Sequence, residues 1–164
     1  MQHAPSQEIS HQGVHCALTI RRPVPGVAVV VLAGSDIGEF GDFPMQELAK
    51  DLARFGALEL FIDARAVRGA SIEVSKEWAL WMRAHRHQLT GVSMLTGSRY
   101  VQMTALFVRR FAELLHQMRI FTDRDAFDEA LAECEASRRG SPARHCENAR
   151  SREANCSAGR RLEE

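Results

Sequence analysis

Ser71 stands directly before a stretch with helical periodicity, and its hydroxyl is a group that could do chemistry there. A serine at a helix start can accept a phosphate, whose charge is favourable at the positive end of the helix dipole. The same hydroxyl can cap the helix by accepting a backbone N–H, a contact worth about 1 kcal/mol. Ser75, one turn later, is either the cap itself or an ordinary helical serine. Both serines are candidates for a partner or phosphorylation surface, with capping as the structural alternative.

Asp63 follows the apolar run 58–62, which is typical of a short buried strand. Open α/β folds bind their ligands at the carboxyl ends of the strands, and Asp63 stands at such an end. There it could orient a ligand, pair with Arg65 or Arg68, or accept N–H groups from its own loop. We expect these three charged side chains to extend the candidate surface around the two serines.

Four aromatic residues fall at helical spacings, Trp78 and Trp81 in one segment and Phe107 and Phe111 in another. Aromatic side chains spaced in this way could line a pocket for a small apolar, lipid-like ligand. The same spacing is typical of helix faces that pack into a core. An enclosed apolar cavity beside these four residues would favour a ligand carrier or sensor, and a filled core there would exclude one.

Catalytic and metal-binding patterns are not found. The sequence contains no G-x-S-x-G turn, and no serine, histidine and acid can be grouped from their positions. His85 and His87 flank Arg86, so on a helix they would point to different sides and could not share a metal ion. Cys146 and Cys156 have no C-x-x-C pairing. We therefore expect no catalytic residue, no metal and no cofactor.

The elements that position these residues follow from hydrophobic periodicity. Alternating apolar side chains predict a half-buried strand at 14–20, and a β-branched run predicts a strand covered on both faces at 27–32. The elements predicted after these are a helix at 43–55, a strand at 58–62, a helix at 72–89, a strand at 92–95, a helix at 100–116, a strand at 118–121 and a helix at 123–134. Strands separated by helices favour right-handed crossovers and parallel pairing, while the first two strands can form an antiparallel hairpin. The sequence predicts an α/β fold with a mixed five-stranded sheet and four helices.

Charge and composition limit the classes of partner. The 164 residues carry 21 basic and 21 acidic side chains, so the formal net charge is zero. The overall charge therefore does not favour binding to nucleic acid or to an anionic membrane surface. The longest apolar run, 27–33, is far shorter than the roughly 20 residues of a membrane-spanning helix. The first dozen residues have no apolar signal-peptide region. We expect a cytoplasmic protein with no membrane span.

The composition changes sharply near residue 135. Residues 135–164 contain Leu162 as their only large aliphatic or aromatic side chain, with seven arginines and five glutamates. Such a segment cannot bury enough apolar surface to offset its chain entropy. The predicted organisation is a flexible N-terminus at 1–12, a folded domain at 13–135 and a disordered Arg-rich tail at 136–164.

The element order, together with three stretches of sequence, resembles the STAS superfamily (sulfate transporter and anti-sigma-factor antagonist) and within it the SpoIIAA-like branch. The stretches are FIDARAVRGASIEV (61–74), RYVQMTALFVRRF (99–111) and MRIFTDRDAFDEALA (118–132). The last is the most characteristic, because members of this branch end with a short strand and an acidic helix. The resemblance covers residues 13–134.

The resemblance implies a non-enzymatic regulatory or protein-interaction module with a protein partner still to be identified. In the phosphorylated relatives the regulatory serine or threonine follows the third strand in an Asp-Ser-Ser/Thr-Gly context. The equivalent segment here, RGASIE at 68–73, keeps Ser71 and lacks that motif. The similarity of this branch to lipid-carrier domains implies the alternative, a carrier or sensor of a small apolar ligand.

Overall fold

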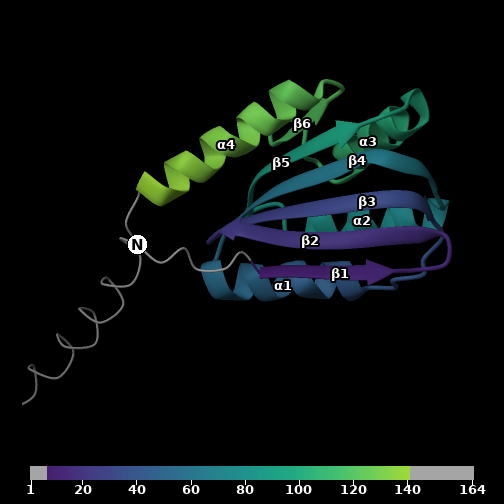
Figure 1. Cartoon of the computed structure of the whole chain (residues 1–164), viewed down its shortest axis with the longest axis horizontal. Coiled ribbons are helices and arrows are strands. Elements are labelled where there is room, and N and C mark those ends of the chain that lie inside the picture. The colour runs from purple at the N-terminus through teal and green to yellow at the C-terminus, as the bar shows by residue number, and fades with distance from the viewer. Residues whose placement is uncertain (1–6, 141–164) are drawn as a thin grey trace, which may run out of the picture.

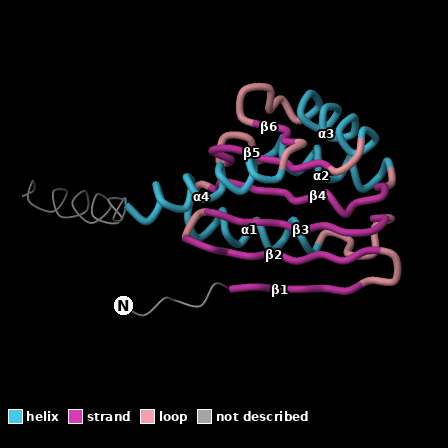
Figure 2. The backbone as a smooth tube through the Cα atoms, turned by 45° about the horizontal axis from the view of Figure 1, so that its top comes forward, coloured by secondary structure: helices cyan, strands magenta, loops and turns pink. Residues whose placement is uncertain are grey.

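The structure is a computed structural model that describes residues 7–140, and it is built on one six-stranded sheet (Figure 1). Its elements are β1 (Gln7–Gln12), β2 (Cys16–Val24), β3 (Val27–Asp36), α1 (Phe43–Phe55), β4 (Leu58–Ala70), α2 (Ile72–Ala84), β5 (Leu89–Thr96), α3 (Arg99–Phe111), β6 (Met118–Phe121) and α4 (Arg124–Gly140). The strands lie side by side in the order in which they occur in the chain (Figure 2).

The sheet is mixed, as predicted. β1, β2 and β3 pair antiparallel, and β3, β4, β5 and β6 pair parallel through helical connections. The mixed sheet with four helices is confirmed, but the prediction of five strands is wrong, because residues 7–12 form the edge strand β1. Its segment QEISHQ has a single aliphatic side chain, Ile9, so periodicity gave no signal. The strand is held by its backbone register with β2 and by His11, whose ring packs 4.3 Å from that of Phe43.

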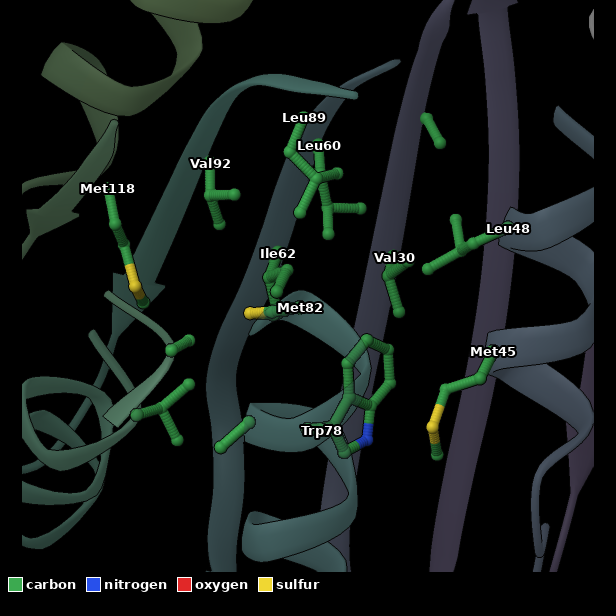
Figure 3. Packing of buried hydrophobic residues seen from close by; sticks show 14 of the residues in the cluster. Val30, Met45, Leu48, Leu60, Ile62, Trp78, Met82, Leu89, Val92 and Met118 are labelled. Carbon is green, nitrogen blue, oxygen red and sulfur yellow. The ribbon is translucent and has the colours of Figure 1, made fainter. Parts of the chain in front are cut away.

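The helices form two layers of unequal size. α1, α2 and α3 cover one face of the sheet and α4 covers part of the other (Figure 1). Successive side chains of β3 point to opposite faces of the sheet and contribute to both cores. Val30 packs under the three helices, and Val29 packs toward α4. Figure 3 shows the larger core, in which Trp78 and Met82 of α2 lie against the sheet. Within the described residues no helix is both long and apolar enough to span a membrane.

Two predicted helices are too long. α2 ends at Ala84 rather than at residue 89, because His85 turns its ring nitrogen Nδ1 to the Trp81 carbonyl, 2.8 Å away, and the chain then enters β5. α3 ends at Phe111 rather than at residue 116, because Glu113 takes a φ of 60°, in the left-handed region that a helix cannot use.

α4 extends beyond its predicted end at residue 134 to Gly140, so residues 136–140 of the predicted tail are helical. The added residues make polar contacts, one within the helix and one to β5. Arg139 pairs with Glu135 at 2.6 Å, and Arg138 donates to the Thr90 hydroxyl at 3.3 Å. The remainder of the predicted tail, 141–164, and residues 1–6 of the predicted flexible N-terminus lie outside the described residues.

Candidate functional site

Ser71 is the N-cap of α2. Its backbone is extended, and its Oγ accepts the Val74 N–H at 3.2 Å. Its own N–H donates to the Asp36 carbonyl at the end of β3, which ties the start of the helix to the sheet. Ser75 is a helical serine whose hydroxyl donates to the Ser71 carbonyl at 3.0 Å. Both hydroxyls are therefore engaged with local backbone, and phosphorylation of either stays a prediction.

Asp63 and Arg65 form a tight pair. Asp63 accepts from Nε of Arg65 at 2.9 Å, from Nη2 at 2.6 Å and from the backbone N–H at 3.1 Å. Burial alone would raise the pKa of Asp63, but the hydrogen bonds from Arg65 outweigh it and hold that pKa below its ordinary value. The carboxylate is thus a fixed anion that orients the arginine.

The predicted surface divides between the two sides of the sheet. Asp63 and Arg65 lie on the α4 side, where Arg124 and Asp128 are their charged neighbours. Ser75, by contrast, lines a cavity on the side of the other three helices. Arg68 is exposed and makes no ion pair with the described residues. The structure brings Asp63 to Arg65 but does not bring either of them to the serines.

The four aromatic residues do not share one pocket. Trp78 is buried in the core (Figure 3), Trp81 is half-buried with its ring 4.6 Å from that of His85, and Phe107 is exposed and stacked on Phe111. A largely apolar cavity of about 80 Å³ does lie between α2, α3 and the sheet, and of the four only Trp78 lines it. A dry cavity of about 150 Å³ accommodates benzene, so this one is too small for a lipid-like molecule. Its volume does not support the predicted ligand carrier.

The outer face of α3 is apolar, although it is turned to solvent. Tyr100, Met103 and Phe107 are spaced by three and four residues and are 57%, 66% and 55% exposed. The sequence reasoning missed this face. The sequence signal for it is a second apolar stripe on the same helix. The buried stripe contains Val101 and Ala105, and a helix that packs through one face needs only that one.

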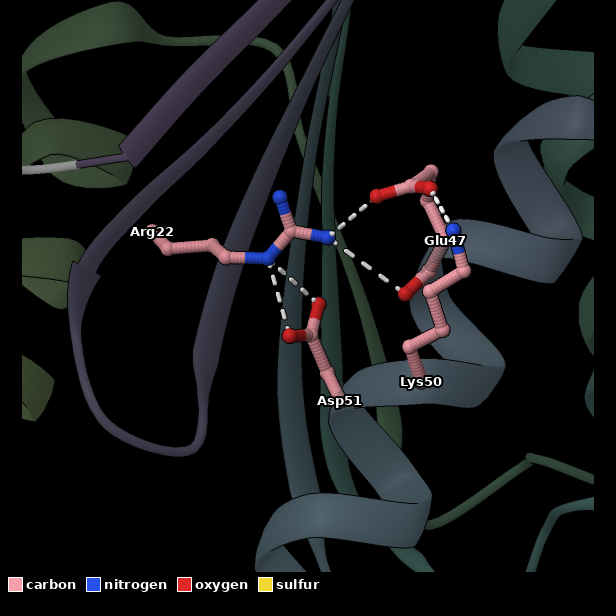
Figure 4. A network of polar contacts seen from close by, with 4 residues as sticks. All are labelled: Arg22, Glu47, Lys50 and Asp51. Carbon is pink, nitrogen blue, oxygen red and sulfur yellow. Dashed lines mark hydrogen bonds and ion pairs between the residues drawn. The ribbon is translucent and has the colours of Figure 1, made fainter.

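A partly buried ionic network joins β2 to α1 (Figure 4). Nε of Arg22 donates to both Asp51 oxygens at 2.8 and 2.9 Å, and Nη2 donates to Glu47 Oε2 at 3.0 Å. Lys50 adds a second cation to Glu47. Each carboxylate therefore has a cation partner, although Nη1 of Arg22 is buried without a hydrogen-bond partner among the described residues. We interpret the network as structural, and the sequence reasoning missed it too.

The described residues offer no reactive thiol or metal centre at neutral pH. Burial, reinforced by a hydrogen bond to Glu39, raises the pKa of Cys16 to about 12, and burial also raises the pKa of Cys134, so both thiols stay protonated. Between residues 7 and 140, no three His, Cys, Asp or Glu side chains are grouped closely enough to hold a metal ion.

Comparison with known proteins extends to the fold alone. No protein-family model matches the chain, and no curated protein matches its sequence. One similar solved structure is an uncharacterized protein of the DUF3478 family with a SpoIIAA-like fold from Shewanella loihica PV-4. It is 15% identical with a TM-score of 0.55, over 74% of this chain and 98% of that one. A second is an anti-sigma factor antagonist from Mycobacterium paratuberculosis, 18% identical with a TM-score of 0.45, over 77% of this chain and 96% of that one.

Proposed function

We propose that this chain, which has a STAS-like domain of SpoIIAA-like fold, is a non-enzymatic regulatory module that binds a protein through the outer side of α2 and α3. The observation that supports it is the exposed apolar row of Tyr100, Met103 and Phe107 on α3. Leu80 of α2, 46% exposed, adds to the apolar surface of this helix pair. Neighbouring exposed apolar side chains on a folded domain mark surfaces that bind other molecules. We call this the α2–α3 face.

The charges on the face suit an acidic partner. In its last turn α3 carries Arg109 and Arg110, and it has no carboxylate, whereas α2 is mixed, with acidic and basic side chains in turn. Arg83 of α2 lies over the Phe111 ring, 5.9 Å from its centroid, but its charge is paired with Glu113 at 2.6 Å. An amphipathic helix with acidic residues beside its apolar stripe would match this arrangement in both apolar area and charge. We infer that such a segment of a partner protein is the occupant.

Ser71 is well placed to regulate this face. The Tyr100 hydroxyl donates to the Ala70 carbonyl at 3.4 Å, so the first turn of α3 lies beside the residue that precedes Ser71. A phosphate on Ser71 would place negative charge at the edge of the face, where it would repel an acidic partner. Arg68, exposed near the end of β4, would be its nearest counter-charge in sequence.

The absence of catalysis is part of the proposal. The hydroxyls of Ser71 and Ser75 bond to backbone groups of their own helix, and Cys16 is held as a neutral thiol. A nucleophile needs an adjacent base or a lowered pKa. Neither serine hydroxyl is hydrogen-bonded to a basic side chain, and the pKa of Cys16 is raised rather than lowered, which supports a binding role.

The test is a binding comparison between face and control variants. Immobilised full-length protein captures partners from an extract of its own cells, and each captured protein is then purified and titrated by calorimetry. The double variant Met103→Glu/Phe107→Glu should weaken partner binding by about 30-fold or more, because the loss of even one buried apolar anchor of about 2 kcal/mol is a factor of about 30. Val14→Glu is the matched control, because Val14 is 87% exposed on the turn between β1 and β2.

The proposal fails if every purified partner binds the double variant and the wild type equally. It also fails if the control variant loses a partner as completely as the double variant does.

A further inference from the structure

A cleft of about 440 Å³ lies where β5 and β6 end and α3 and α4 begin, beside Arg65 in the second half of β4. Three arginines from three different elements line it: Arg65 of β4, Arg99 of α3 and Arg124 of α4. The hydroxyls of Ser98 and Thr122 also line it, and no carboxylate does. Its volume falls in the range of about 300 to 1,000 Å³ typical of small-molecule sites. The cleft stands at the carboxyl ends of parallel strands, where open α/β folds bind their ligands.

The three guanidinium groups keep donors available. Arg65 uses Nε and Nη2 on Asp63, and Arg124 uses Nε on Asp128 at 3.2 Å. Nη1 of Arg65 and both terminal nitrogens of Arg124 make no hydrogen bond with the described residues. Arg99 has no carboxylate within 4 Å in the part of the chain that the structure describes. The two carboxylates therefore hold two arginines in place, and Arg99 supplies uncompensated positive charge.

The backbone adds donors at the same place. The Ser98 hydroxyl accepts a hydrogen bond from the Val101 N–H. The backbone N–H groups of Arg99 and Tyr100 donate to no described residue. The first turn of α3 has no acidic side chain to occupy its positive end. Gly97 allows this turn to lie against β4, because a Cβ there would stand 2.3 Å from the Arg65 carbonyl oxygen. That close approach sets the first turn of α3 beside Arg65.

We propose that this cleft binds the phosphate of a small phosphomonoester. Guanidinium groups from three elements, together with backbone N–H groups, surround the space from several directions. A tetrahedral phosphate can accept from all of them, whereas a planar carboxylate accepts in one plane. The site lies apart from the outer apolar row of α3, so it is a second binding function, independent of the protein partner.

The test titrates full-length protein with inorganic phosphate and with phosphoserine, by calorimetry and by amide NMR shifts, at constant ionic strength set with sodium chloride. Wild type should bind one phosphoserine per chain and shift the amides of Arg99 and Tyr100. Arg99→Gln should weaken binding by about tenfold, the scale of one charge-assisted hydrogen bond. Arg110→Gln is the matched control, since Arg110 is an exposed arginine on the same helix outside the cleft and should leave affinity unchanged.

The proposal is overturned if wild type shows no saturable binding of either probe up to about 10 mM, which corresponds to less than about 3 kcal/mol of affinity. Equal losses in Arg99→Gln and Arg110→Gln would also overturn it, because they would mean general charge attraction only. Binding of inorganic phosphate without any gain for phosphoserine would reject the ester and leave a site for the free ion. Met103→Glu/Phe107→Glu should keep its phosphate affinity, so the failure of one function is distinguishable from the failure of the other.

Discussion

Replacing Arg22 by leucine should destabilise the fold by about 3 kcal/mol. Arg22 is the only cation that pairs with Asp51 among the described residues, and both carboxylates it contacts are buried. Removing one partner of a buried ion pair costs about 3 to 5 kcal/mol, because an uncompensated charge is left behind. We expect a loss at the lower end of this range, because Glu47 keeps Lys50 as a partner in the variant.

Urea denaturation followed by tryptophan fluorescence measures this loss. Lys50→Ala is the matched control, because Lys50 is 69% exposed and its pairing with Glu47 should be worth less than about 1 kcal/mol. An Arg22→Leu loss no larger than that of the control would refute the view that the network holds β2 to α1.

Comparing wild type with Arg22→Leu at several pH values tests the role of charge in this network. Hydrogen bonds from Lys50 and then from Arg22, against the opposing effect of burial, hold the pKa of Glu47 below its ordinary value of 4.5. A carboxyl with a lower pKa in the folded chain stabilises the fold above its unfolded pKa, and that stability is lost as pH falls through the folded value. Arg22→Leu lacks one source of the depression, so its difference from wild type in unfolding free energy should shrink as pH falls below 4.5. A difference that stays constant over this range would contradict the mechanism.

Three further outcomes are expected. Trp78→Ala should cost about 3 to 5 kcal/mol in chemical denaturation, and a loss below about 1 kcal/mol would contradict its burial in the core. Ser71→Ala should cost about 1 kcal/mol through the lost cap, while Ser71→Asp should stay folded and bind the partner of the α2–α3 face more weakly in calorimetry. Truncation after Gly140 should move the melting temperature by less than about 5 °C, because the residues removed carry almost no apolar side chains; a larger drop in a thermal scan would mean that they dock.

Local pattern was enough to predict most of the fold. The β-branched run that became β3 and the spacing of buried residues on the helices are signals within a few residues, and they led to the mixed sheet and the four helices. β1 was not predicted, because an edge strand can have few apolar side chains when backbone pairing with the neighbouring strand sets its register. β4 continues past its predicted end at residue 62 because residues 66–70 pair with β3, as in Asp36 with Ala70, and not because of their side chains.

The candidate sites were less predictable, because they too depend on contacts between segments that are far apart in the chain. The capping geometry of Ser71 and the Asp63–Arg65 pair depend on neighbours in sequence, and both were anticipated as alternatives. The phosphate cleft depends on Arg65, Arg99 and Arg124, which are far apart in the chain and meet only through strand order. The division of the predicted surface between two sides of the sheet likewise follows from the alternation of side chains along β4, which a list of residues does not show.

The strand order of the sheet bears on how the molecule is made. Since every strand pairs with its neighbour in sequence, no pairing has to wait for a strand that lies beyond the next one in the chain. The antiparallel unit β1–β2–β3 is complete before α1 has been synthesised, and each later strand–helix unit adds to an existing edge. The growing chain can therefore assemble in the order of its translation, with a single strand edge awaiting its partner at each step.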